Sequence, residues 1–218
     1  MSDSLALSDL QAEQRRGSRY VLDYLGVIMY VLSILWLGFA LIALREETVQ
    51  LRILRMMIFL LVGSGAFLFG LRVQMRFTMR DMVTILVVGA PIFLIGGLAL
   101  IGGSPQMPST VTVVYYICVG TAEELFFRGF LFLLTGRMVA VWGVRGKLIN
   151  YLLNGLLFGI YHAYAYGGDI GAMVTAAAAG MLFAIIFDTT GHLSYPMVIH
   201  AVYDIMLAIA TGHAPLGV

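Results

Sequence analysis

Apolar runs separated by short polar segments make up most of the chain. A helix needs about 20 mainly apolar residues to cross the hydrocarbon core of a bilayer. Seven runs reach or approach this length, and we expect each to form a membrane-spanning helix. The expected spans are 20–44, 56–71, 82–101, 110–136, 148–166, 170–187 and 195–211. The pattern therefore predicts an all-α fold, a polytopic bundle of about seven transmembrane helices.

Small residues and one proline mark several of these spans. The second span is short and contains Gly63, Gly65 and Gly70, which would let another helix approach closely. Pro91 lies inside the third span, where we expect a kink. The sixth span contains four alanines followed by a glycine, 176–180, and this run predicts a smooth packing face.

The composition agrees with a membrane protein. Of the 218 residues, 61% are hydrophobic and 11% are charged, whereas a soluble globular protein is about one quarter charged. Because the connecting segments are short, we expect a polar N-terminal arm, 1–19, and a single transmembrane domain, 20–218. The N-terminus lacks the pattern of a cleaved signal peptide. A single cysteine, Cys118, excludes an internal disulfide and a cysteine metal cluster.

Lysines and arginines in short loops predict the orientation in the membrane. The bias favours a cytoplasmic N-terminus and places one polar linker, 45–55, on the opposite side. The cytoplasmic set would be Arg15, Arg16, Arg19, Arg72, Arg76, Arg80, Arg137, Arg145 and Lys147, and the opposite set Arg45, Arg52 and Arg55. The short loops and the lack of targeting signals predict a multi-pass protein of a plasma membrane, and we expect a bacterial inner membrane.

Charged side chains interrupt the fourth span in the stretch 120–129, which reads GTAEELFFRG. An ionised side chain near the bilayer centre costs about 2.5–3.5 kcal/mol on insertion scales. Glu123, Glu124 and Arg128, with Asp204 in the last span, would together cost on the order of 10 kcal/mol if left ionised and unpaired. Since intramembrane charges usually mark function, we expect the site to be built around this stretch.

The two adjacent acids are expected to have different roles. Glu124 and Arg128 are four residues apart, so they lie on one helix face and can form an ion pair. Glu123 is turned away from Glu124 by about 100°. Glu124 and Arg128 are therefore expected to be a structural pair, while Glu123 is free to act as a base.

Two later spans carry polar stripes with the same helical spacing. Phe158 and His162 are four residues apart, and Asn154 lies one step earlier on that face. His200 and Asp204 repeat the spacing in the last span. We expect these stripes to meet Glu123 in one interior cavity.

Such a cavity suits two mechanisms. In one, Glu123 and His162 polarise a water that attacks an amide, while His200 and Asp204 stabilise the oxyanion. In the other, Glu123, His162 and His200 bind a zinc ion that generates the hydroxide.

Three motifs, in this order on separate spans, resemble those of the CPBP intramembrane proteases. They read EELFFR, FGIYH and HAVYD. That family, also called ABI, includes the type II CAAX prenyl endopeptidase and bacterial immunity-associated members. The resemblance covers 110–211, the last four spans, and so implies a four-helix catalytic core that hydrolyses peptide bonds inside the membrane.

The resemblance also implies residue roles. Glu123 and His162 become the water-activating pair, and His200 with Asp204 the oxyanion side. Glu124 and Arg128 become supporting residues, and we place Asn154 with them. The family has been described both as metalloproteases and as metal-independent glutamate proteases. We favour the second description and expect no cofactor, with zinc as the alternative.

Position 204 departs from the pattern of the prenyl-processing members. Asp204 stands where those members have asparagine. An ionised aspartate cannot donate a hydrogen bond to an oxyanion. Asp204 must instead orient His200, hold a proton or bind a metal, and a prenylated substrate is therefore in doubt.

The expected span ends leave a geometric difficulty. His200 would lie about 7–8 Å along its helix from the cytoplasmic end, whereas His162 would lie about 20 Å from that side. The two can meet only if the loop 188–195 dips into the protein or if the helices tilt.

Two other functions are compatible with the same residues. A non-catalytic interaction or immunity protein could use the polar network to bind a partner. A transporter or proton relay could use Glu123, His162, His200 and Asp204. For the protease, the expected partners are membrane lipid and a membrane-associated protein or peptide substrate, and we expect no nucleic acid.

Overall fold

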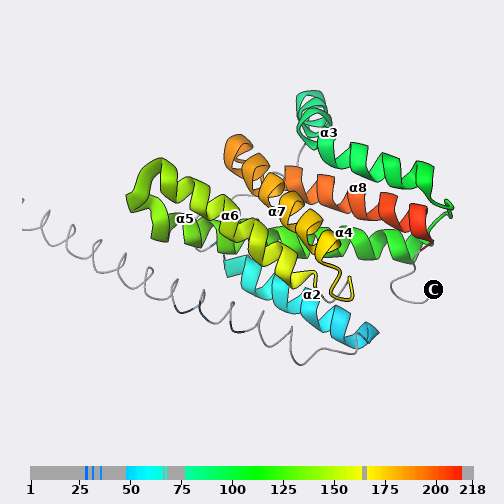
Figure 1. The fold of residues 1–218 in the computed structure, drawn as a ribbon, viewed down its shortest axis with the longest axis horizontal. Coiled ribbons are helices and arrows are strands. Elements are labelled where there is room, and N and C mark those ends of the chain that lie inside the picture. The colour runs from blue at the N-terminus through cyan, green and yellow to red at the C-terminus, as the bar shows by residue number, and fades with distance from the viewer. Residues whose placement is uncertain are drawn as a thin grey trace, which may run out of the picture.

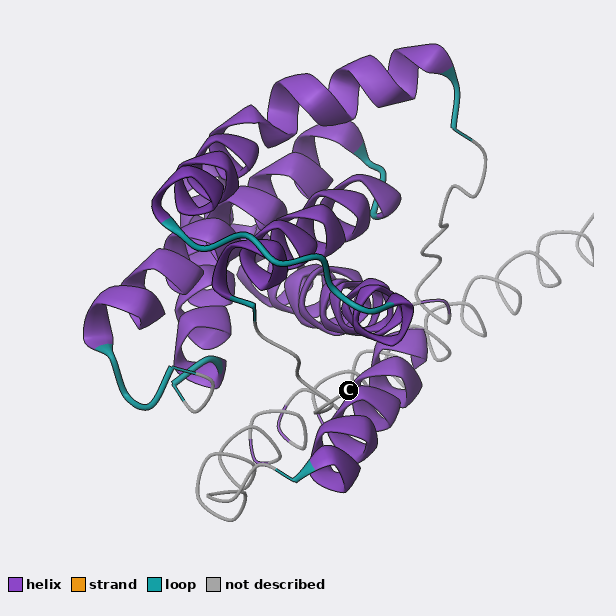
Figure 2. Ribbon diagram, turned by 90° about the vertical axis from the view of Figure 1, so that its right-hand side faces the viewer, coloured by secondary structure: helices purple, strands orange, loops and turns teal. Residues whose placement is uncertain are grey.

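The computed structural model describes residues 48–65, 67, 77–163 and 166–212, together with the single positions 28, 31 and 35. The expected arm 1–19 and nearly all of the span 20–44 lie outside the described residues. The described part is helical and contains no strand (Figure 2). The all-α fold class is therefore confirmed for this part of the chain.

The helices follow one another with short connections. They are α2 (Val49–Ser64), α3 (Met79–Gly102), α4 (Thr110–Glu124), the π-helical segment η2 (Leu125–Phe132), α5 (Leu133–Val139), the 3-10 turn η3 (Ala140–Trp142), α6 (Gly143–Tyr161), α7 (Ile170–Thr190) and α8 (Ser194–Thr211). Gly143 has a φ of +56° and lies where α6 turns back after η3. The helices α4, η2 and α5 thus form one arm of a hairpin, and α6 forms the other.

Four helical stretches in the described part are long and apolar enough to cross a membrane. They are Met79–Gly102, Thr110–Tyr161, Ile170–Thr190 and Ser194–Thr211. The second stretch includes both arms of the hairpin and therefore covers the fourth and fifth expected spans. Many large apolar side chains point outward, among them Leu86, Val87 and Ile101. A lipid environment accounts for this exposure, whereas water would not favour it. The count of seven spans remains a prediction.

Several helix ends differ from the expected ones, and two of these differences affect the site. Thr48 caps α2, and its side chain accepts a hydrogen bond from the Leu51 backbone. The helix therefore begins at Val49, and Arg52 and Arg55 lie on α2 rather than in the linker 45–55. The helix α6 ends at Tyr161, five residues before the expected end.

The helix α8 lies between α3 and α4, and α7 packs against α6 (Figure 1). The helix α2 packs against η2 and α4. Close helix approaches depend on small residues: a Cβ atom at Gly63 would lie 2.9 Å from backbone atoms of Leu125 and Phe126. The small-residue run of α7 contacts α6, because Gly155 meets Ala177 and Gly180 meets Phe158. The helix α3 continues through Pro91 and changes direction along its length (Figure 1).

The beginning of α8 lies inside the protein. Leu193, Ser194 and Tyr195 are all at most 4% exposed. The Tyr195 hydroxyl donates a hydrogen bond to Asp81 in the first turn of α3. The chain therefore enters the helix bundle at Leu193, and the buried first turn of α8 places His200 deep enough to approach the end of α6.

Candidate active site

The site is built where α4 changes into the π-helical segment η2. The change follows directly after Glu124, and all eight residues of η2 are buried. Asn154 of α6 donates a hydrogen bond to the Phe127 carbonyl at 2.7 Å, and Asn150 donates one to the Phe132 carbonyl at 3.0 Å. These bonds fix α6 against η2. Short π-helical segments often occur at functional sites.

Arg128 connects three helical segments at the base of the site. Its side chain is fully buried, and Nη1 lies 2.9 Å from Glu124 Oε1. Nη2 donates a hydrogen bond to the Gly180 carbonyl of α7 at 2.9 Å. The guanidinium carbon also lies 4.4 Å from the centre of the Phe158 ring of α6. The expected Glu124–Arg128 ion pair is thus present and joins η2 to α6 and α7.

Glu124 has a second partner that the sequence did not predict. His200 Nδ1 lies 2.8 Å from Glu124 Oε1. His200 also stacks on the Phe183 ring, with centroids 5.2 Å apart and planes 22° apart. Glu124 and Phe183 therefore fix the orientation of the His200 ring and leave its Nε2 facing the site.

Glu123 lies in the middle of the site and is 5% exposed. Its Oε1 accepts a hydrogen bond from the Tyr161 hydroxyl at 3.2 Å. Its Oε2 is buried and has no hydrogen-bond partner among the described residues. Oε2 lies 3.7 Å from His162 Nε2 and 3.9 Å from His200 Nε2. One carboxylate oxygen thus faces two imidazole nitrogens at distances too long for direct hydrogen bonds.

His162 follows the last residue of α6. Its Nδ1 lies 2.8 Å from the Phe158 carbonyl oxygen. A carbonyl can only accept a hydrogen bond, so Nδ1 carries the hydrogen. In the neutral ring, Nε2 is then an acceptor and faces Glu123. Tyr166, in the loop before α7, stacks on the outer side of this ring at 5.7 Å.

Asp204 completes the group of side chains expected from the sequence. Its Oδ2 lies 3.5 Å from His200 Nε2, and its side chain is 17% exposed. The structure therefore brings Glu123, His162, His200 and Asp204 together. Glu124 and Arg128 lie behind them, while Asn154 supports η2 instead of reaching the reacting groups. Tyr161, which the sequence suggested only as an aromatic that could line a substrate groove, is a further site residue through its hydrogen bond to Glu123.

The side chains of Glu123, His162 and His200 could also act as zinc ligands. Imidazole nitrogen and carboxylate oxygen are suitable ligands for zinc. Within the described ranges, however, no group of three or more His, Cys, Asp or Glu side chains is arranged to hold a metal ion. We therefore derive the chemistry from the side chains alone and treat zinc as an alternative to be tested.

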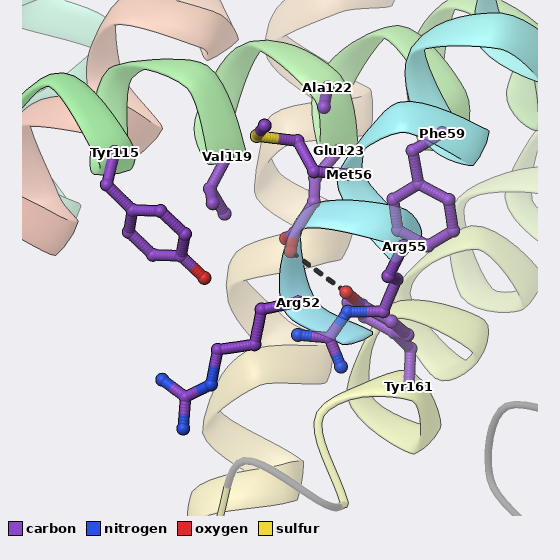
Figure 3. Close-up of a pocket in the computed structure, with 9 residues that line it drawn as sticks. All are labelled: Arg52, Arg55, Met56, Phe59, Tyr115, Val119, Ala122, Glu123 and Tyr161. Carbon is purple, nitrogen blue, oxygen red and sulfur yellow. Dashed lines mark hydrogen bonds between the residues drawn. The ribbon is translucent and has the colours of Figure 1, made fainter. Parts of the chain in front are cut away.

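A pocket reaches Glu123 from the side of α2 (Figure 3). Its lining comes from α2, α4 and α6. The residues are Arg52, Arg55, Met56, Phe59, Tyr115, Val119, Ala122, Glu123 and Tyr161. The helix α2 begins within the expected linker 45–55, and this places Arg52 and Arg55 in the wall of the pocket. Their spacing of three residues was the signal that could have placed them on one helix face.

Comparison with protein families gives a match over part of the chain. The family model described as "Type II CAAX prenyl endopeptidase Rce1-like" matches residues 105–206. No curated protein and no solved structure matches the chain. The matched segment begins just before α4, ends within α8, and includes every side chain of the site described above except the four from α2, which are Arg52, Arg55, Met56 and Phe59.

Proposed function

Residues 105–206 belong to the Rce1-like type II CAAX prenyl endopeptidase family, and on this basis we propose that the protein is an intramembrane endopeptidase. It hydrolyses a peptide bond of a membrane-associated protein or lipopeptide. The family is a protease family, and four apolar helical stretches in the described part make the chain a membrane protein.

The observation that carries this mechanism is the free oxygen of Glu123. Its Oε2 lies 3.7 Å from His162 Nε2, and both atoms are acceptors when Glu123 is ionised and His162 is neutral. A water between them would donate one hydrogen to each, which is the usual way to bridge such a gap. As the water oxygen attacks the carbonyl carbon, Glu123 takes one proton. The same proton can then pass to the leaving amine.

The opposite side of the cavity receives the oxyanion. His200 Nε2 lies 3.9 Å from Glu123 Oε2 and 3.5 Å from Asp204 Oδ2. With Glu124 holding Nδ1, the doubly protonated ring donates from Nε2 to the oxyanion. Asp204 orients this ring, a role that an ionised aspartate can fill although it cannot donate.

We test the mechanism with Glu123→Gln and His162→Gln. Each variant is reconstituted in liposomes with a library of lipidated, quenched-fluorescent peptides. Loss of the general base should lower cleavage by about 10²–10⁴-fold. Asp188→Asn is the control, because Asp188 pairs with Lys147 at 2.6 Å near the end of α7, away from the site. Full activity of both site variants would overturn the mechanism. A phenotype rescued by Glu123→Gln would instead favour an interaction protein.

A further inference from the structure

We propose that Tyr161 is a positioning residue for the general base. Its hydroxyl holds one oxygen of Glu123, so that the other oxygen stays directed at the water that attacks the peptide bond. This inference rests on the proposed peptidase function and adds a residue to its mechanism. Tyr161 is the last residue of α6 and directly precedes His162. The motif FGIYH is defined by Phe158 and His162, so the role of Tyr161 is inferred from the structure.

The hydrogen bond from Tyr161 distinguishes the two oxygens of the Glu123 carboxylate. The hydroxyl donates to Oε1 at 3.2 Å, and both residues are buried. The other oxygen, Oε2, lies 3.7 Å from His162 Nε2 and 3.9 Å from His200 Nε2. Rotation of the carboxylate would exchange the two oxygens, but it would also break the bond to Tyr161. The bond therefore keeps Oε2 on the side of the imidazole rings.

The gap between Glu123 and the histidines needs such a restraint. In the proposed mechanism the His200 ring is doubly protonated, and its Nε2 lies 3.9 Å from Glu123 Oε2. Opposite charges attract strongly at this distance inside a protein. A carboxylate that moved into direct contact with His200 would close the space that the attacking water needs. The hydrogen bond that Tyr161 makes to the other carboxylate oxygen opposes this movement.

The phenol ring of Tyr161 is itself held by neighbours from α2 and η2. Its centroid lies 5.1 Å from that of Phe59 and 5.5 Å from that of Phe127, with ring planes tilted by 51° and 50°. The guanidinium carbon of Arg55 lies 5.2 Å from the ring centre. Figure 3 shows Arg55 and Phe59 near the ring and the Tyr161 hydroxyl directed at Glu123. Because a close-packed ring has little room to turn, the hydroxyl stays at the carboxylate. The helix α2, which precedes the family match, thus supports the general base through Tyr161.

The test compares Tyr161→Phe with Tyr151→Phe in the liposome cleavage assay. Each substitution removes the hydroxyl of a tyrosine of α6 that donates to a carboxylate, since Tyr151 donates to Asp188 Oδ2 at 2.5 Å. Tyr161→Phe keeps the ring, so KM should stay the same while kcat falls at least about tenfold. Tyr151→Phe should leave both constants unchanged. Adding Tyr161→Phe to Glu123→Gln should lower cleavage no further, because the hydroxyl acts through Glu123.

Two kinetic results would overturn the inference. An unchanged kcat in Tyr161→Phe, with Glu123→Gln inactive, would refute the positioning role and leave the peptidase mechanism standing. Equal losses of kcat in Tyr161→Phe and Tyr151→Phe would mean that the loss follows from lower stability.

Infrared spectroscopy tests the same hydrogen bond without a substrate. The difference spectrum between wild-type and Glu123→Gln protein isolates the carboxylate stretching bands of Glu123. A shift of these bands in Tyr161→Phe supports the inference even if no peptide is cleaved, and unshifted bands refute it.

Discussion

At the scale of single residues, the two histidines are oriented by different acceptors. The Phe158 carbonyl holds Nδ1 of His162, and Glu124 holds Nδ1 of His200. Both Nε2 atoms are left facing Glu123 Oε2. The role of each neighbouring acid therefore follows from what surrounds it: Glu124 Oε1 contacts a buried guanidinium and an imidazole, while Glu123 Oε2 faces the Nε2 atoms of both histidines.

This difference predicts that the same substitution has unequal effects on stability at the two neighbouring positions. Glu124→Gln leaves the guanidinium of Arg128 as an uncompensated buried charge, and such losses cost about 3–5 kcal/mol. Glu123→Gln should change stability little, because Oε2 makes no hydrogen bond to a described residue. Denaturant unfolding in detergent micelles measures both. The assignment of roles fails if Glu123→Gln destabilises the protein as much as Glu124→Gln does.

Whether the site needs a zinc ion is also decided by single residues. If the side chains alone activate the water, cleavage should persist after dialysis against a chelator, and purified protein should contain far less than one equivalent of zinc. Elemental analysis and the peptide assay are run on the same sample. Equimolar zinc that is lost together with activity, and restores activity on return, would make Glu123, His162 and His200 metal ligands instead.

Within single helices, spacing was enough to predict the polar pairs. Glu124 with Arg128 and His200 with Asp204 are four residues apart, and the structure shows both pairs in contact. The hydrogen bonds between His200 and Glu124 and between Tyr161 and Glu123 could not be predicted in this way. They join residues 76 and 38 positions apart, so they depend on how the helices pack.

At the scale of elements, the π-helical segment η2 is the feature that apolar periodicity could not reveal. Every residue of η2 is buried, so no polar face records its geometry. The signal lies instead on α6, where Asn150 and Asn154 donate to carbonyls of η2. Span ends were also misplaced, because a capping threonine before α2 and the early end of α6 are local features that hydrophobicity does not report.

Asn154→Leu tests whether η2 depends on α6. The substitution removes the hydrogen bond to the Phe127 carbonyl and leaves a buried acceptor, which costs about 1–3 kcal/mol. We expect lower stability and a lower cleavage rate, because Phe127 is three residues after Glu124 on the chain. Leu156→Ala, at a position 54% exposed on the outer face of α6, is the control and should change neither. Equal behaviour of the two variants would contradict a supporting role for Asn154.

At the scale of the whole molecule, helices that start at different depths bring the site together. His200 lies six residues into α8, whereas His162 follows the end of α6. The expected difficulty disappears because Leu193 and the first turn of α8 are buried, so α8 starts inside the bundle. Sequence reasoning identified the need for such an entry, but it could not show that Leu193 packs against η2, α6 and α7 or that Tyr195 contacts α3.

The orientation of this bundle decides which side of the membrane supplies the substrate. The helical run from α4 to α5 has Met107 just before one end and Val141 just after the other, and these side chains are 89% and 82% exposed. With a cytoplasmic N-terminus, Met107 should lie outside the cell membrane and Val141 inside. In a Cys118→Ser background, a membrane-impermeant maleimide should therefore label Met107→Cys in intact cells and Val141→Cys only after permeabilisation. The reverse labelling pattern would mean that the bundle has the opposite orientation in the membrane. The pocket at α2 would then receive substrates from the other leaflet, although the arrangement of Glu123 and the two histidines would stay the same.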